Sequence, residues 1–369
     1  MNDALPMTTN PALGIIIFVL GGLAGAVFYL PLKKVKSWAW ESYWLFWALF
    51  ALLIVPIALA LITSPNTFSV LKASPSSELW HCYLGGAAWG LGGLTWGLMI
   101  RYLGVGLGLA IGCGLCSAAG TIVPKVLKGE FGQLFQTHAG IVSFISVVVS
   151  LLGIVLVGMA GMSKEKELPE EEKKKSVAEY NFKKGMLVAL FSGLMSAALS
   201  LGLQAGGTIE KLAKTTEPVT PVAWAGMPVL VVALLGGFTV NFLWCLFLNA
   251  KNKTFGDYTK KGAPIVPNVI FGAIAGAIWV CQFVAFKTGE PKMGDQSYVG
   301  WAVLMASSIM FSGALGLMLG EWKGTSSRTR GLLGLGLVVL LGSAVLSGYS
   351  GKLGQDAAAK TPVPAVQTK

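Results

Sequence analysis

The chain alternates between long apolar runs and short polar segments. A helix of about 20 apolar residues spans the roughly 30 Å hydrocarbon layer of a bilayer, and ten runs of about this length follow one another. They cover approximately residues 12–32, 38–62, 80–100, 103–123, 139–160, 184–205, 224–248, 266–287, 298–319 and 330–349. Backbone polar groups must be bonded internally in lipid, so each run is expected to be a helix. The pattern predicts an all-α polytopic membrane protein with about ten transmembrane helices.

Lys and Arg residues are unevenly distributed among the segments between these runs. Eighteen of the 28 follow the odd-numbered runs, and ten lie in the other connections and the tails. Loops rich in Lys and Arg are retained on the cytoplasmic side of the membrane. We therefore expect the loops after the odd-numbered runs to be cytoplasmic and both termini to face the periplasm.

The longest polar segment, residues 163–183, contains the mixed-charge sequence KEKELPEEEKKK. Such a composition is typical of a solvated cytoplasmic linker. It separates a first five-helix repeat, residues 1–162, from a second, residues 184–349, and a polar C-terminal tail follows at 350–369. Because each half has an odd number of spans, two related halves cross the membrane in opposite senses. The sequence thus predicts two inverted five-helix repeats.

Weak internal similarity supports this arrangement. Residues 22–26 (GLAGA) align with residues 193–197 (GLMSA) of the sixth run. A second alignment pairs the third run with the eighth, and matches Gly86, Gly90 and Arg101 with Gly272, Gly276 and Lys287. Under the predicted topology Arg101 lies at the cytoplasmic face and Lys287 at the periplasmic face, as inversion requires.

Composition excludes a water-soluble fold. Hydrophobic residues make up 54% of the 369 and charged residues only 12%, and the mean hydropathy is +0.68, against roughly 25% charged residues in soluble domains. The 48 glycines suit helices that approach each other closely in lipid. The net charge of +11 does not indicate nucleic acid as a partner, because the basic residues form no stripe with interleaved aromatics. The expected partner is the lipid bilayer.

The sequence contains no motif for chemistry on a substrate. It has no phosphate-binding G-x-x-x-x-G-K-[ST] loop, and its two histidines, His81 and His138, form no metal-binding pattern. Cys113 and Cys116 spell C-x-x-C, but they fall inside a predicted span, which favours buried thiols over a redox site. We expect no enzyme activity, no metal and no cofactor.

Polar side chains at membrane depth are costly and are therefore candidates for function. Asn241 lies near the middle of the seventh run, and Gln282 lies in the eighth beside Trp279. Their amides either bond neighbouring helices or bind a polar ligand, and the sequence favours neither. With Tyr29 and Trp96 they form the candidate substrate-binding set. Aromatic faces and amides without an obligatory charge suit a neutral sugar better than an ion, although such aromatics also suit contact with lipid.

Three charged residues are candidates for proton coupling or gating. Glu41 lies about one turn inside the second run, Glu321 ends the ninth, and Arg101 ends the third. The alternative for Glu41 is a structural ion pair, either with Arg101 or with one of the lysines at positions 33, 34 and 36. Between the two interpretations of Glu41, we favour the ion pair.

Residues 28–41 (FYLPLKKVKSWAWE) resemble the end of the first span and the first loop of the L-rhamnose-proton symporter family, within the drug/metabolite transporter superfamily. Shorter matches follow in family order at residues 101–104 (RYLG), 181–185 (NFKKG), 241, 282–283 (QF) and 321–322 (EW). The resemblance implies ten spans, import of L-rhamnose or a related deoxysugar, and coupling to protons.

We therefore expect a multi-pass protein of the bacterial inner (plasma) membrane that imports sugar by proton symport with alternating access. Its small partners are then an L-rhamnose-like sugar and protons. Two alternatives remain open from the sequence. One is a drug/metabolite superfamily exporter or exchanger of another small metabolite, and the other is a membrane receptor or structural protein without transport activity.

Overall fold

The structure is a computed structural model that describes residues 10–104, 107–112, 114–116, 119, 126, 129, 131–169, 171, 177, 179–289, 292–293 and 300–360. Cys113 and most of the second half of the mixed-charge sequence lie outside these residues, as do positions 361–369 of the expected tail. The described residues form helices joined by turns, in agreement with the predicted all-α class.

The first half contains α1 (Pro11–Val27), η1 (Pro31–Lys34), α2 (Trp40–Leu49), η2 (Phe50–Ile54), α3 (Val55–Thr63), α4 (Thr67–Ala73), α5 (Ser76–Leu103), η3 (Phe131–Phe135) and α7 (His138–Glu167). The second half contains α9 (Phe182–Gln204), α10 (Gly207–Thr215), η4 (Val222–Trp224), α11 (Met227–Asn252), η5 (Phe255–Tyr258), α12 (Ile265–Gly289), α13 (Gly300–Met318) and α14 (Ser327–Lys360).

Seven helical stretches of the described chain are long and apolar enough to cross a membrane, judged by length and composition. They are Ala12–Lys34, Trp40–Thr63, His138–Lys164, Phe182–Leu203, Val222–Asn252, Ile265–Phe286 and Ser327–Gly354. The other three predicted runs fall in α5, in the partly described region that contains the short helix Leu107–Cys116, and in α13, which contains Val303–Met318. α5 has 28 residues, but its many glycines add little hydropathy.

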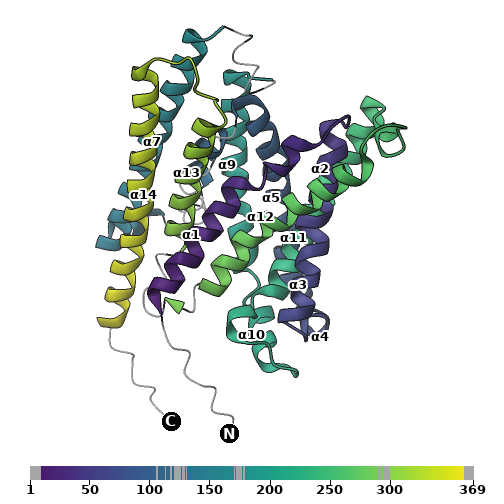
Figure 1. Ribbon diagram of the computed structural model, residues 1–369. Helices are drawn as coiled ribbons and strands as arrows, with labels where there is room; N and C mark the ends of the chain where they lie inside the picture. Colours follow the sequence, from purple (N-terminus) through teal and green to yellow (C-terminus); the bar gives the residue numbers. More distant parts are fainter. Residues whose placement is uncertain are drawn as a thin grey trace, which may run out of the picture.

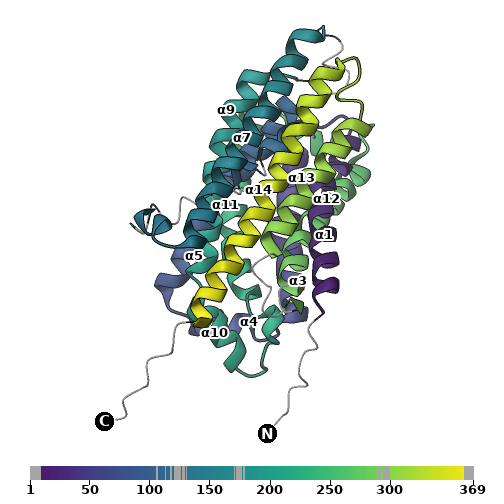
Figure 2. The ribbon, with the colours of Figure 1, turned by 90° about the vertical axis from the view of Figure 1, so that its left-hand side faces the viewer.

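The long helices pack in groups along a common direction (Figure 1 and Figure 2). α1 packs against α12 and α13, α5 packs against α9 and α11, and α2 lies against both α11 and α12. α7 and α14 form a further pair. The start of α1 and the end of α14 lie at the same end of the molecule as α4 and α10, whereas the connection that contains η5 lies at the opposite end (Figure 1).

Apolar side chains cover the outside of the bundle as well as its interior. Large hydrophobic residues on several helices are more than half exposed, among them Leu20, Leu187, Leu194, Val338 and Val345. In water such a surface would be unfavourable, but in a bilayer it contacts lipid chains that are equally apolar. The exposed apolar surface is consistent with a multi-pass membrane protein.

Two helices extend beyond the ends predicted for them. α7 continues through Glu167, into the segment expected to be a solvated linker, and α14 continues to Lys360, into the expected tail. Lys164 is fully buried, and its ammonium group lies 5.0 Å from the centre of the Tyr180 ring and 5.1 Å from that of Trp322. Such cation–π contacts favour burial of a charge. The described ends of this segment are therefore packed onto the bundle.

The second predicted run is one helical stretch with a π-helical turn inside it. α2 leads into η2, a π turn, and η2 leads into α3, whose second residue is Pro56. Proline has no N–H to donate to the preceding turn, and a π turn is one way in which a helix accommodates such a break. This break lies directly after the tryptophan-rich part of α2.

Candidate functional site

Seven aromatic residues from four helices form a contiguous group at the centre of the largest buried cluster, and we call it the aromatic cluster. Its members are Phe28, which caps the end of α1, Trp40, Trp44 and Trp47 of α2, Trp89 of α5, and Trp279 and Phe283 of α12. The rings of Trp44 and Trp47 lie 4.3 Å apart, and Trp279 meets Trp47 edge to face at 5.6 Å. Positions 40, 44 and 47 share one face of α2, because they are spaced at helical intervals.

Asn241, a predicted substrate residue, connects three helices next to this cluster. Its Oδ1 accepts a hydrogen bond from the indole N–H of Trp44 at 3.0 Å. Its Nδ2 donates to the carbonyl groups of Gly237 at 2.8 Å and Gly90 at 3.3 Å. The side chain is fully buried. In this structure the amide is used to join α2, α5 and α11.

Gln282 lies where α1, α12 and α13 meet. Its Nε2 donates to the carbonyl oxygen of Trp279 at 3.0 Å, so two predicted substrate residues are brought together. A Cβ at Gly25 would lie 3.3 Å from Gln282 Oε1 and 3.1 Å from the hydroxyl of Ser308. Gly25 of α1 therefore lets two polar groups, from α12 and α13, approach this helix closely.

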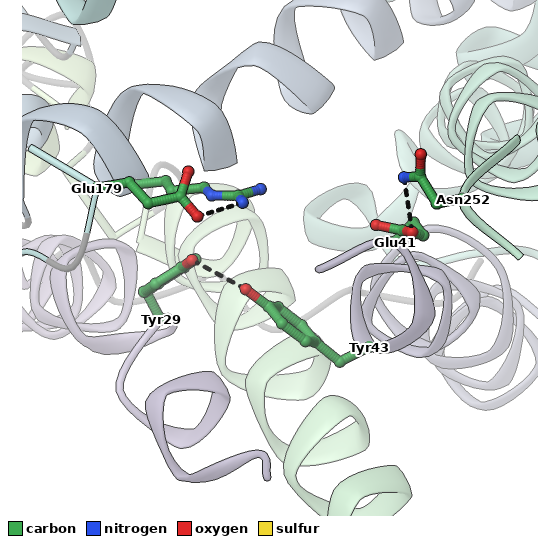
Figure 3. Close-up of polar contacts among 6 residues, drawn as sticks. Tyr29, Glu41, Tyr43, Glu179 and Asn252 are labelled. Atoms are coloured by element: carbon green, nitrogen blue, oxygen red, sulfur yellow. Dashed lines mark hydrogen bonds and ion pairs between the residues drawn. The ribbon is translucent and has the colours of Figure 1, made fainter. Parts of the chain in front are cut away.

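Tyr29 and Trp96 are the remaining predicted substrate residues. The hydroxyl groups of Tyr29 and Tyr43 point toward one another and lie 3.4 Å apart (Figure 3). Tyr29 belongs to the same buried cluster as Trp279. Trp96 is partly buried and packs against this cluster and against a second one built by α5, α7 and neighbouring segments. The structure thus places Trp279 in the aromatic cluster, Tyr29 and Gln282 beside it, and Trp96 at its border.

Arg101 makes an ion pair with Glu179, from the end of the segment that joins the two halves (Figure 3). The backbone N–H of Asn181 donates to the carbonyl oxygen of Tyr102 at 3.0 Å, which ties this segment to the end of α5. Glu179 could not be identified from the sequence, because a charged residue in a polar linker shows no pattern that identifies its partner.

Glu41 is buried, with 5% of its surface exposed, and it accepts hydrogen bonds from neutral groups. Asn252 Nδ2 donates to its Oε1 at 2.9 Å (Figure 3), and Thr254 Oγ1 donates to the same oxygen at 2.9 Å. The expected ion pair with Arg101 or a nearby lysine is wrong, because Arg101 binds Glu179 and no ion pair of Glu41 occurs among the described residues. The end of α11 supplies the donors that the sequence could not reveal.

Glu321 is almost completely buried, and Lys33 of η1 lies 3.9 Å from its carboxylate. Gly104, with a φ of 86°, lies beside it, and a Cβ there would be 2.8 Å from Glu321 Oε2. Only glycine adopts this conformation readily. The three predicted coupling or gating residues thus belong to three separate contacts, each with a different partner.

The sequence of this chain matches known proteins over nearly its whole length. The profile of the L-rhamnose-proton symport protein (RhaT) family matches residues 7–352. The L-rhamnose-proton symporter of Enterobacter sp. (strain 638) is 32% identical over 352 residues, which are 94% of this chain and 98% of that protein. Its counterpart in Escherichia coli (strain SMS-3-5 / SECEC) is 31% identical over 346 residues, 93% of this chain and 98% of that protein. No solved structure matches the chain.

The matching family is one of symport transporters, which are not enzymes, and the membrane-length apolar helices are consistent with a membrane protein of this kind. This is the family that the motif at residues 28–41 resembles. The chain is a multi-pass membrane protein that belongs to the L-rhamnose-proton symport protein (RhaT) family.

Proposed function

We propose that this protein imports L-rhamnose or a related deoxysugar across the bacterial inner membrane together with protons. The observation that carries the proposal is the similarity, over more than nine tenths of the chain, to proteins named L-rhamnose-proton symporters. The loops after the odd-numbered predicted runs hold most of the Lys and Arg residues and are proposed to be cytoplasmic.

The arrangement of the chain ends favours ten crossings over seven. The start of α1 and the end of α14 lie at the same end of the molecule (Figure 1), which requires an even number of crossings. Length and composition identify seven helical stretches. Adding α5, α13 and the region of the short helix Leu107–Cys116 gives the ten spans that we propose, five in each half.

Contacts of equivalent glycines support two inverted repeats, as in the drug/metabolite transporter superfamily. Gly22 and Gly193 are equivalent in the internal alignment. A Cβ at Gly22 would lie 2.5 Å from Ser307 in the ninth predicted run, and one at Gly193 would lie 2.4 Å from Leu115 in the fourth. The fourth and ninth runs occupy equivalent places in the two halves, so the two glycines make equivalent cross-half contacts.

The second pair of aligned runs behaves in the same way. A Cβ at Gly90 of α5 would lie 2.9 Å from Gly237 of α11, and one at Gly276 of α12 would lie 2.7 Å from Ala51 of η2. The third run thus packs on the seventh as the eighth packs on the second. Two halves related in this way alternate access by rocking against each other, and we propose that mechanism here.

The sugar site is assigned to five residues that lie in or beside the aromatic cluster: Tyr29, Trp96, Asn241, Trp279 and Gln282. Flat indole faces suit the apolar faces of a sugar ring, and amide and hydroxyl groups suit its hydroxyls. Asn241 is already bonded to three protein groups, so its part is to hold Trp44 and the neighbouring helices in position.

Proton coupling is assigned to Glu41, and gating to Arg101 and Glu321. Glu41 is a buried carboxylate with neutral donors, and an ionisable group of this kind inside a transporter is suited to carry a proton. Arg101 and Glu321 each bind a charged group of another segment. Contacts of that kind can open and close as the segments move apart and together.

Uptake by purified protein in proteoliposomes tests the proposed function. Labelled L-rhamnose should accumulate against its concentration gradient when the outside is more acidic than the inside, and should only equilibrate when the pH is equal on both sides. Empty liposomes provide the control. A protein that moves no rhamnose under either condition would contradict the proposal, and transport of another metabolite instead would support the exporter or exchanger alternative.

A further inference from the structure

The three tryptophans on the inner face of α2 differ in whether their indole N–H groups have a hydrogen-bond acceptor. Trp44 donates its N–H to Asn241 at 3.0 Å. Trp40 and Trp47 are 7% and 2% exposed, and within the described part of the chain no group accepts a hydrogen bond from either indole. Of these three buried N–H groups on one helix, one thus has an acceptor and two have none among the described residues.

An unpaired buried donor is unfavourable, because the group has given up its hydrogen bond with water without replacing it. Native proteins contain few such groups, and each one calls for an explanation such as a ligand that supplies the missing acceptor. A neutral sugar offers several hydroxyl oxygens as acceptors, together with an apolar face that matches an aromatic ring.

Of the two tryptophans whose N–H is unpaired, Trp47 is the one that contacts a residue proposed to bind the sugar. Its ring meets Trp279 edge to face at 5.6 Å and lies 6.0 Å from Phe28, the neighbour of Tyr29. Trp279 in turn accepts the hydrogen bond from Gln282. Trp40 instead stacks on Trp44 at 5.2 Å, and a Cβ at Gly97 of α5 would lie 3.3 Å from its ring.

The backbone next to Trp47 is suited to adjust when a ligand binds. The π turn η2 begins at Phe50 and is followed by Pro56, and π turns in helices occur frequently at functional sites. Gly276 of α12 lets the backbone of α2 approach closely, since a Cβ there would lie 3.1 Å from the carbonyl oxygen of Trp47. Trp47 therefore lies at a close contact of two helices, directly before an irregular turn.

We propose that the indole N–H of Trp47 donates a hydrogen bond to one hydroxyl group of the transported sugar and so helps to select it. This inference rests on the proposed function, because it assigns a residue to the same sugar site. Trp47 does not belong to the candidate substrate-binding set predicted from the sequence.

Binding of L-rhamnose and its monodeoxy analogues to the purified full-length protein tests the assignment by calorimetry. Trp47→Phe should bind L-rhamnose about tenfold more weakly, the effect of losing one hydrogen bond. Trp47→Phe breaks no hydrogen bond within the described part of the protein, so its melting temperature should not fall for that reason. The one analogue that lacks the accepting hydroxyl should bind the unsubstituted protein about tenfold more weakly and should lose nothing further in Trp47→Phe.

Trp44→Phe is the matched control, because it removes an N–H that is already bonded to Asn241. It should lower the melting temperature, and any loss of affinity should be equal for all the sugars. If Trp47→Phe does not fold, benzothienylalanine at position 47 makes the same test, since it keeps the bicyclic ring and lacks the N–H.

Unchanged rhamnose affinity in the position-47 variants, or an equal loss for every analogue, would overturn the assignment of Trp47 while leaving the proposed function intact. If the unsubstituted protein binds no rhamnose, the proposed function fails and this assignment fails with it. The two failures are thus distinguished by the behaviour of the unsubstituted protein.

Discussion

Individual buried polar side chains in this protein have partners that lie far away in the sequence. Asn241 receives a hydrogen bond from Trp44, and Glu41 receives its two from residues 252 and 254. The sequence predicts that these side chains lie deep, from their places in apolar runs. It cannot predict their partners, because those depend on which helices pack together. The lysines nearest to Glu41 in sequence suggested an ion pair, whereas the end of α11 occupies that place in the structure.

Asn241→Ala tests whether this amide joins helices or binds sugar. The substitution leaves the N–H of Trp44 and two carbonyl groups without their partner, so we expect the free energy of unfolding to fall by about 1–3 kcal/mol. Thermal unfolding of the detergent-solubilised protein measures the effect. A variant with unchanged stability and strongly weakened rhamnose binding would show that the amide serves the ligand instead.

Glu41→Gln tests the proposed proton carrier. Glutamine keeps an oxygen that accepts from Asn252 and Thr254, but it cannot take up and release a proton. We expect proton-driven accumulation of rhamnose to be lost and exchange of labelled for unlabelled rhamnose to continue. Glu210→Gln, which removes a half-exposed ion pair with Lys214, is the control. Normal accumulation by Glu41→Gln would remove Glu41 from the coupling mechanism.

At the scale of helices, the sequence predicts which segments are helical better than it predicts where they end. α7 extends into the charged segment because Tyr180 and Trp322 cover Lys164, and neither contact is visible from composition. The apolar runs that became α1, α11 and α12 were predicted directly. The glycine alignments indicated close contacts, but only the structure identifies the partner helix.

Two Gly→Ala substitutions should have opposite effects on stability. Gly86 of α5 is packed closely against α11, whereas Gly334 of α14 has room for a side chain. A Cβ at Gly86 would lie 1.7 Å from the carbonyl oxygen of Ala233, so Gly86→Ala must push two backbones apart, at a cost of about 3 kcal/mol or more. Around Gly334 of α14, no described atom beyond its chain neighbours and the adjacent backbone of its own helix lies within 4 Å of the place that a Cβ would occupy, and alanine there should gain up to about 1 kcal/mol of helix stability. Melting temperatures measure both, and equal shifts would contradict the packing.

Glu167 joins the end of α7 to the start of α14 and lies outside the membrane-spanning stretch. The backbone N–H of Ser326 and the hydroxyl of Thr329 donate to its carboxylate at 2.6 and 2.5 Å. These bonds, the Ser326 N–H first, lower the pKa of Glu167 from its usual 4.5 to about 2. Because the folded state favours the charged form, this stabilisation is complete above the usual pKa and is lost as the pH falls toward 2.

Glu167→Gln should therefore lower the melting temperature at neutral pH, since the amide nitrogen cannot accept from Ser326 or Thr329. The difference in melting temperature between the variant and the unsubstituted protein should become smaller as the pH falls from 4.5 to 2. Thermal unfolding in detergent across this range measures the effect. A difference that is independent of pH would show that the carboxylate charge does not contribute.

At the scale of the whole molecule, the sequence predicts the all-α class, the multi-pass character and the family. Length and composition identify seven stretches that could cross a membrane, and the even number of crossings that we propose rests on where the chain ends lie in three dimensions. The proposed pairing of the two halves also rests on that arrangement, because a short glycine-rich alignment does not show which helices touch.

The central claim is that sugar and proton move together through this bundle. Its most direct test is the internal pH of proteoliposomes that contain a pH-sensitive dye and start without a pH gradient, with the membrane potential held at zero. When L-rhamnose is added outside, sugar entry should carry protons inward and acidify the interior, and Glu41→Gln should abolish the acidification. Entry of labelled rhamnose without any change in internal pH would contradict the claim.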